Sequence, residues 1–325
     1  MIKKIYLFAL IILSILLIYI TIFNFPKKFI SRLIFSHDLS LLTYSVFNNI
    51  NNEINFDMTK KKNQKKSLIV LNNYVYDFFG EIFDNIDDGV SWKMLHGSTR
   101  CDGFADIFLR LSENINTRVA MIFLYNTDGI STHTLNYVDL DNSINNFNDH
   151  SQLNKMYLFD PTYNFFPVNK NSEYVNIDYM MKNRNEFLHY ENIDINNFKL
   201  NFLQENRKVF MINRTYDEYS IINKLSFKLV KIFPKNILKF IFKFGIYINP
   251  ELEIDYKKFL YARLEHIMLN YEEAKIKYSK ITDKNIYYDN AQFWYKRILS
   301  SEAKLKKYED ILSPLISSNF NENLK

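Results

Sequence analysis

The stretch TRCDGFADIFLRLSENINTRVAMIFLY, residues 99–125, joins a helical pattern to a strand pattern and contains the only cysteine of the 325-residue chain. Its first part predicts a helix that runs from Cys101 to about Glu113. Its last part, residues 117–125, is a short apolar run of the kind that forms a buried strand. The dipeptide DG at 128–129 then predicts a turn.

Two more strands are expected beyond this turn. Residues 132–140 predict a second strand, and residues 155–160 predict a third that is closed by Pro161. An Asn- and Asp-rich stretch, 141–154, reads as an exposed loop between them. Because a helix comes first and the strands follow one another, the order predicts an α+β fold with an antiparallel sheet rather than alternating β-α-β units.

The composition is that of a folded chain with few specialised features. Hydrophobic residues make up 47% and aromatic residues 17%, which is enough for a packed core. The net charge is only +5, and Lys and Arg are scattered, so nucleic-acid binding is not expected. A lone cysteine excludes an intramolecular disulfide and a zinc site built on two thiolates. We expect no metal and no cofactor.

The N-terminus carries a long apolar run. No charged residue occurs from Ile5 to Phe25, a length that crosses a hydrocarbon core of about 30 Å as a helix. We interpret it as an uncleaved single-pass membrane anchor, with a cleaved signal peptide as the alternative. Basic residues flank both sides and leave the orientation open. An extracytoplasmic location of the domain beyond the anchor is compatible with a solitary cysteine and is favoured.

The chain divides into an anchor, a connector, a central domain and a helical C-terminal region. A polar connector ends in the charge run TKKKNQKK, and everything beyond about residue 195 reads as helical. The four predicted segments are 1–26, 27–66, 67–195 and 196–325.

The C-terminal region contains two patterns of its own. The segments 261–281 and 294–316 resemble a pair of tetratricopeptide helical hairpins with a 34-residue period, and plain helical hairpins fit equally well. Between Lys224 and Lys243, lysines recur every three or four residues against a broad apolar face. We favour a core helix with a solvated lysine edge, and a helix lying on an anionic bilayer is the alternative.

The setting of Cys101 suits a reactive thiol. Thr99 and Asp102 have the spacing of a capping box, which puts Cys101 in the first turn of its helix. There the unpaired N–H groups and the helix dipole stabilise a thiolate. His133 opens the neighbouring strand as a candidate base, and Asp160 ends the third strand as its orienting acid. On these grounds alone, a nucleophile and a structural thiol both remain open.

These residues also carry a resemblance. The segments RCDGFADIFLRLSENINTRVAMIFLY, HTLNYVDL and YLFDPTYN resemble the transglutaminase-like superfamily over about residues 68–170. In that family's pattern Cys101 corresponds to the nucleophile, His133 to the base and Asp160 to the acid. Other residues match the surrounding motif or depart from it: Ala105, Arg118, Pro161 and Thr162 match, whereas Thr99 stands in place of glycine, and Thr134 and Leu135 in place of a small residue and tryptophan.

The resemblance implies a papain-like α+β core and acyl transfer through a Cys-His-Asp triad. The backbone N–H of Cys101 and the side chain of Trp92 are the candidate oxyanion donors. Hydrolysis of a protein or peptide substrate, as by a protease or amidase, is favoured over cross-linking to an amine. The rival hypothesis is an inactive scaffold that binds a protein partner through its helical C-terminal region. A metal site built from His133, His150 and Asp149 or Asp160 is the least favoured interpretation.

Overall fold

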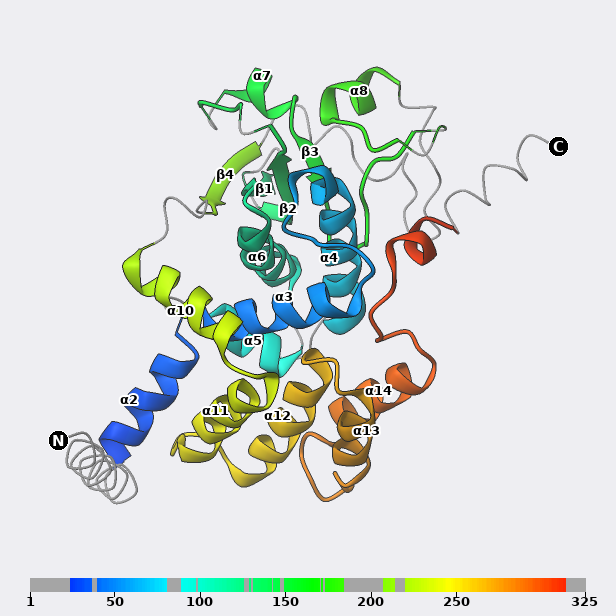
Figure 1. Cartoon of the computed structure of the whole chain (residues 1–325). Coiled ribbons are helices and arrows are strands. Elements are labelled where there is room, and N and C mark those ends of the chain that lie inside the picture. The colour runs from blue at the N-terminus through cyan, green and yellow to red at the C-terminus, as the bar shows by residue number, and fades with distance from the viewer. Residues whose placement is uncertain are drawn as a thin grey trace, which may run out of the picture.

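The central sheet is antiparallel throughout and its strands run in the order β3-β2-β1-β4 (Figure 1). The predicted α+β class is therefore confirmed. The first three strands, Arg118–Tyr125, Ser131–Asp139 and Tyr157–Phe159, lie within two residues of their predicted ends. The fourth, Arg207–Ile212, pairs with β1 and was not expected, because the sequence beyond residue 195 was interpreted as helical.

The structure is a computed structural model that describes residues 24–36, 40–80, 89–97, 99–125, 129, 131–141, 143–146, 149–169, 171, 173–183, 207–213 and 220–313. The helices of its N-terminal half are α2 (Asn24–Ile34), α3 (Leu41–Glu53), the 3₁₀ turn η1 (Lys61–Asn63), α4 (Gln64–Phe78), α5 (Val90–His96), α6 (Cys101–Ser112) and the 3₁₀ turn η2 (Glu113–Ile115). The helices that follow β2 are α7 (His150–Leu153), α8 (Ile177–Lys182), α10 (Ile221–Ile232), α11 (Lys235–Ile248), α12 (Ile254–Ile267), α13 (Tyr271–Ser279) and α14 (Tyr288–Leu299).

Helix α6 covers one face of the sheet, and the side chains of β1 show why. Val119 and Met121 join the main core that contains α6, whereas Ala120, Ile122 and Leu124 join a second cluster on the opposite face. This is the two-residue alternation of a strand buried on both sides. On β2, Asn136 donates a hydrogen bond to the Ala105 carbonyl of α6 at 3.0 Å and ties the helix to the sheet.

The main core continues from α6 through α3 and α4 into the C-terminal helices. Arg263 on α12 is fully buried. Its guanidinium donates to the carbonyl oxygens of Phe78 and Met94, at 2.8 and 3.4 Å, and stacks on Trp294. The C-terminal helices are thus packed into the same core as the helices before the sheet. The tetratricopeptide resemblance and the domain boundaries stay predictions.

The segment expected as a connector, 27–66, is largely helical. Most of α2, all of α3 and the start of α4 fall within it, and α3 buries Leu42, Tyr44, Val46 and Ile50. This stretch therefore contributes helices to the packed fold, and its bounds as a connector stay a prediction. Its Asn-rich composition concealed the apolar positions that face the core.

The predicted localisation needs correction. Within the residues that the structure describes, no helix has the length and apolar character needed to cross a bilayer, and this finding argues against the single-pass anchor. Most of the predicted segment, Ile5–Phe25, falls among residues 1–23, which lie outside the described residues.

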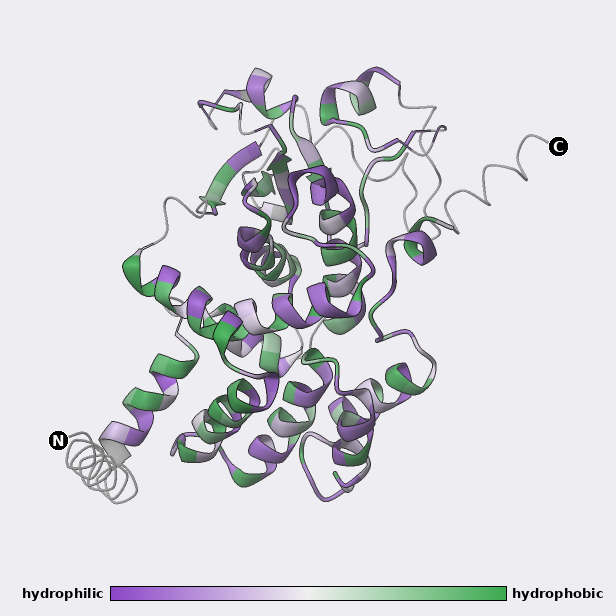
Figure 2. Cartoon of the chain, in the orientation of Figure 1, coloured by the Kyte–Doolittle hydropathy of each residue, from purple (hydrophilic) through white to green (hydrophobic). Residues whose placement is uncertain are grey.

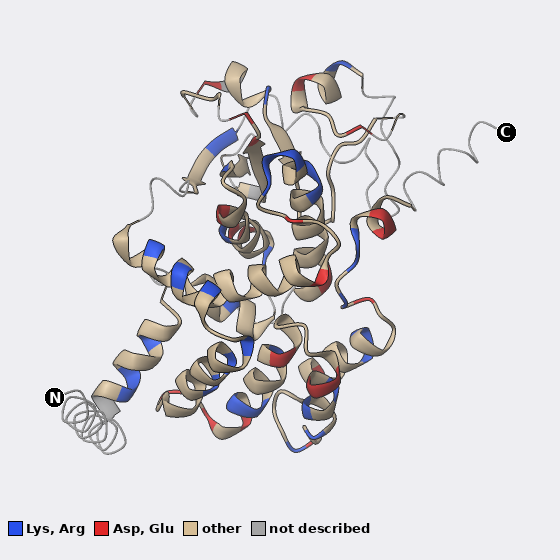
Figure 3. Cartoon of the chain, viewed as in Figure 1, with Lys and Arg blue, Asp and Glu red and all other residues tan. Residues whose placement is uncertain are grey.

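The lysine-rich segment between Lys224 and Lys243 forms α10 and α11. Helix α11 packs on α2 and buries Leu238, Phe242 and Ile246, as a core helix should. Helix α10 differs, because it exposes most of its large apolar residues. Figure 2 shows how hydrophobic and hydrophilic residues follow one another along this helix. Figure 3 shows the lysines that accompany them along α10. The core-helix interpretation therefore holds for α11 and fails for α10; the exposed apolar residues of α10 are Ile221, Ile222, Leu225 and Ile232.

A buried carboxylate where α4 meets the C-terminal segment gives a first prediction. Burial raises the pKa of Asp77 to about 6, against the positive charge of Lys306, whose Nζ lies 3.1 Å away. The folded chain therefore holds this proton more tightly than the unfolded chain, so its contribution to stability is full below about pH 4 and is lost as pH rises through about 6. Two pKa units correspond to about 3 kcal/mol.

We expect Asp77→Asn to abolish this pH dependence and to unfold at a higher denaturant concentration than wild type at pH 8. The exposed Asp310→Asn on the same C-terminal segment is the control and should change neither quantity. If Asp77→Asn is the less stable protein at pH 8, the ion pair with Lys306 outweighs the burial of the charge.

Candidate active site

Cys101 is the first residue of α6, and Arg100 before it takes the N-cap position with an extended backbone. The predicted capping box of Thr99 and Asp102 is wrong, since no side chain caps this helix. Thr99 packs instead on Gly103, where a Cβ would overlap its side chain. The expected place in the first turn is nevertheless confirmed. The half-buried thiol therefore lies where unpaired N–H groups and the positive end of the helix dipole favour an anion.

His133 lies near the start of β2, beside a break in the strand pairing. Leu124 pairs with His133 and Tyr125 with Ser131, so residue 132 is the extra residue of a bulge. A bulge bends its strand and re-aims the neighbouring side chains. The side chain of His133 hydrogen-bonds to Cys101. The start of β2 and the start of α6 therefore both contribute to one site.

Asp160 follows β3 and is fully buried. Two backbone hydrogen bonds with Phe165, of 2.8 and 2.9 Å, close a tight loop over residues 161–164. The carboxylate Oδ2 lies 2.6 Å from Nε2 of His133, and Oδ1 accepts the backbone N–H of Thr162 at 3.0 Å. Each carboxylate oxygen thus has a donor, so the loop fixes the carboxylate and the carboxylate fixes the ring.

The three predicted residues therefore meet as a hydrogen-bonded chain of sulfur, imidazole and carboxylate. Because Nε2 of His133 faces Asp160, the other ring nitrogen is left for Cys101. Burial lowers the pKa of His133, but the charge and hydrogen bond of Asp160, with those of Cys101, outweigh it and raise the pKa to about 10.

The pKa of the Cys101 thiol is shifted in the opposite direction to that of His133. Burial raises the pKa of Cys101, but the hydrogen bond and charge of His133 and two hydrogen bonds from Thr134 outweigh it, so the pKa lies below its ordinary value. Both shifts favour the form of the pair in which Cys101 is a thiolate and His133 an imidazolium. Such a pair is a nucleophile with a proton donor beside it.

Two residues at the site were not predicted to belong to it. Thr134 follows His133 on β2, and its position beside a candidate base was the only available signal. Tyr163 lies in the tight loop after Asp160 and is 41% exposed. Its ring centroid is 5.3 Å from that of His133, with the planes inclined by 40°, so it covers part of the imidazole.

The remaining candidates have other surroundings. Trp92, the candidate oxyanion donor, lies on α5 and packs on Phe35 with ring centroids 4.7 Å apart, and its catalytic role stays a prediction. His96 contacts the Tyr256 hydroxyl at 2.9 Å, and His266 is buried against Arg263. In the part of the chain that the structure describes, no group of three or more His, Cys, Asp or Glu side chains is placed to hold a metal ion.

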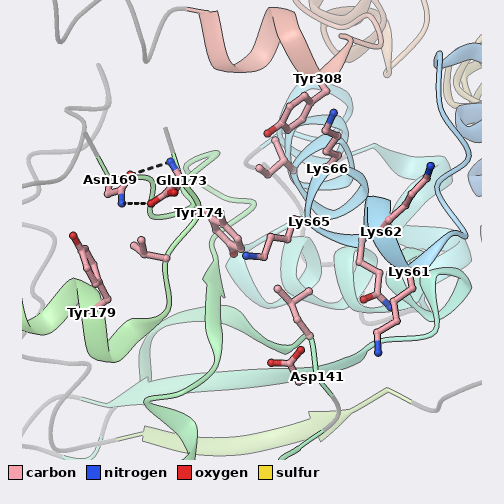
Figure 4. Close-up of a pocket in the computed structure, with 14 residues that line it drawn as sticks. Lys61, Lys62, Lys65, Lys66, Asp141, Asn169, Glu173, Tyr174, Tyr179 and Tyr308 are labelled. Carbon is pink, nitrogen blue, oxygen red and sulfur yellow. Dashed lines mark hydrogen bonds between the residues drawn. The ribbon is translucent and has the colours of Figure 1, made fainter. Parts of the chain in front are cut away.

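A pocket of about 750 Å³ opens at the other end of β2 (Figure 4). It is lined by Leu140 and Asp141 from that strand end and by lysines from η1 and the start of α4. Lys66 lies over the ring of Tyr308 at 5.0 Å. None of the three residues of the sulfur–imidazole–carboxylate chain belongs to its described lining, so this pocket is separate from the candidate active site.

No protein-family model, curated protein or solved structure matches this chain. The geometry of the site and the motifs around Cys101, His133 and Asp160 are therefore what indicates a function.

Proposed function

We propose that this chain is a thiol enzyme of the transglutaminase-like type that hydrolyses a peptide or carboxamide bond through Cys101, His133 and Asp160. One observation carries the proposal: a single imidazole is held by a buried carboxylate at 2.6 Å and also hydrogen-bonds to the sulfur at the start of a helix. A base that contacts the nucleophile on one side and an orienting group on the other is the arrangement that activates a thiol.

The topology around these residues supports the family resemblance. The cysteine opens a helix that packs on an antiparallel sheet, the histidine lies near the start of the second strand and the aspartate directly follows the third. The motif segments thus come together in space, as a papain-like core requires. The resemblance itself remains part of the proposal.

In the proposed reaction the thiolate of Cys101 attacks the carbonyl carbon and forms a C–S bond. As the C–N bond breaks, the imidazolium of His133 gives its proton to the leaving amine, and a thioester remains on Cys101. Water then attacks the thioester while His133 takes a proton from it, and the thiolate leaves with release of the acid. Backbone N–H groups at the start of α6 are the proposed oxyanion donors, each worth about 3–4 kcal/mol.

The proposal is tested by alkylating Cys101 with iodoacetamide, which reports on this residue alone because the chain has one cysteine. At pH 6 the folded chain should react faster than the same chain in denaturant. The thiolate fraction rises tenfold for each unit by which the pKa falls, and the lower intrinsic nucleophilicity cancels about half of this on a logarithmic scale. The alkylation rate should therefore rise about threefold for each unit by which the pKa of Cys101 falls.

His133→Ala should remove this advantage and should abolish hydrolysis of a peptide library, which the wild-type chain should cleave. Products coupled to an added amine would instead identify amine transfer. Slow alkylation that does not respond to His133→Ala, with no turnover, would overturn the proposal in favour of an inactive scaffold that binds a protein partner.

A further inference from the structure

Thr134 is a buried hydroxyl residue at the point where β2 meets the start of α6. Its side chain is only 2% exposed. It pairs with Phe123 of β1, directly beside the bulge that precedes His133. Two residues further along the strand, Asn136 is hydrogen-bonded to Ala105 of α6, and side chains two apart on a strand share a face. Thr134 therefore points to the face that α6 covers.

Two groups of Thr134 hydrogen-bond to the sulfur of Cys101: its side-chain hydroxyl and its backbone N–H. A backbone N–H can only donate, so the sulfur must accept from it, and a thiolate accepts far better than a thiol. The hydroxyl rotates freely and can donate as well. His133 is the other group that hydrogen-bonds to this sulfur, so Thr134 supplies two of the three hydrogen bonds that lower the pKa of Cys101.

We propose that Thr134 is a positioning residue that holds the sulfur of Cys101 for attack and stabilises its thiolate through these two donors. This inference deepens the proposed function and rests on it. The hydroxyl's contribution is greatest in the resting enzyme, where the negative charge is on sulfur. When the C–S bond forms, that charge moves to the substrate oxygen and the hydrogen bonds to sulfur weaken.

A role in packing alone makes a different prediction. Valine has nearly the shape of threonine, so a site that needs only volume accepts it. A site that needs the hydroxyl loses a hydrogen bond to a charged group. Serine keeps the hydroxyl and loses a methyl group, so the two substitutions separate hydrogen bonding from volume. The backbone N–H is kept in both, and the experiment therefore measures the hydroxyl alone.

The test is the pH profile of iodoacetamide alkylation of the full chain. The acid midpoint of this profile is the pH at which the alkylation rate has fallen to half its maximum. Thr134→Val should raise this midpoint by about one pH unit. Thr134→Ser should keep the wild-type midpoint. The control is Thr117→Val, which removes another buried hydroxyl, one that bonds to the Asp139 carbonyl at 3.0 Å near the far end of β2. It should leave the midpoint unchanged.

An unchanged midpoint in Thr134→Val, or an equal shift in the serine and valine variants, would overturn the inference. If Thr134→Val does not fold, Thr134→Ala provides the same comparison with serine. Failure of the proposed function looks different: the wild-type midpoint would then equal that of the chain in denaturant. A lowered wild-type midpoint that Thr134→Val does not move would reject Thr134 and keep the triad.

Discussion

Replacing Asp160 with asparagine is expected to reduce hydrolysis by about 10³- to 10⁴-fold. The carboxylate accepts from Nε2 of His133 at 2.6 Å and supports the imidazolium. An asparagine amide donates to Nε2 instead, which moves the ring proton to the nitrogen beside Cys101. That nitrogen can then no longer take the proton of the thiol. The acid midpoint of Cys101 alkylation should rise in the same variant, because the pKa of His133 falls without the negative charge.

Asparagine is chosen because it can remove the activity and still leave the protein folded. The asparagine carbonyl oxygen can still accept the backbone N–H of Thr162, which Oδ1 now accepts at 3.0 Å. The control is Asp141→Asn at the opposite end of β2, which removes the same charge from an exposed position. Thermal unfolding of both variants gives their stability. Wild-type turnover in a folded Asp160→Asn protein would exclude the proposed role of this carboxylate.

Replacing Gly97 with alanine is expected to destabilise the protein by about 3–5 kcal/mol. Gly97 ends α5 with φ at +79°, a left-handed conformation that costs an alanine about 1–2 kcal/mol. A Cβ there would also overlap the guanidinium of Arg263. That group cannot move aside freely, because it donates to two buried carbonyl oxygens and stacks on the ring of Trp294 at 4.1 Å.

Gly89, at the other end of the same helix, is the matched control. Its φ is −57°, and no atom lies within 4 Å of an added Cβ, so Gly89→Ala should cost less than about 1 kcal/mol. Denaturant unfolding measures both variants. Equal effects at the two ends would mean that Arg263 adapts to the extra carbon and does not brace this turn. A large loss at Gly97 alone would show that α12 supports the segment leading to Cys101.

The sequence was most informative where its pattern was local. The helix from Cys101 and the strand that follows it could be predicted because each has its own periodicity and a clear boundary. The meeting of Cys101, His133 and Asp160 followed from their places at element ends, since the ends of adjacent antiparallel strands and of a helix packed on them come together.

What could not be predicted depends on distant partners. Strand β4 is a half-exposed edge strand that is held by its pairing with β1, whereas the sequence beyond residue 195 was interpreted as helical. The segment 27–66 is helical because its apolar residues face helices far away in the chain. Thr134 could not be recognised as a donor to sulfur, since that contact requires the register of β2 against α6.

The bulge at residue 132 implies an unequal tolerance to change in this part of the gene. A substitution there leaves the number of residues between the paired positions 131 and 133 intact, and with it the pairing of Ser131 with Tyr125 and of His133 with Leu124. An in-frame deletion of that codon would restore ordinary pairing and rotate the end of the strand. Natural variants should therefore differ at this position in residue type far more readily than in length.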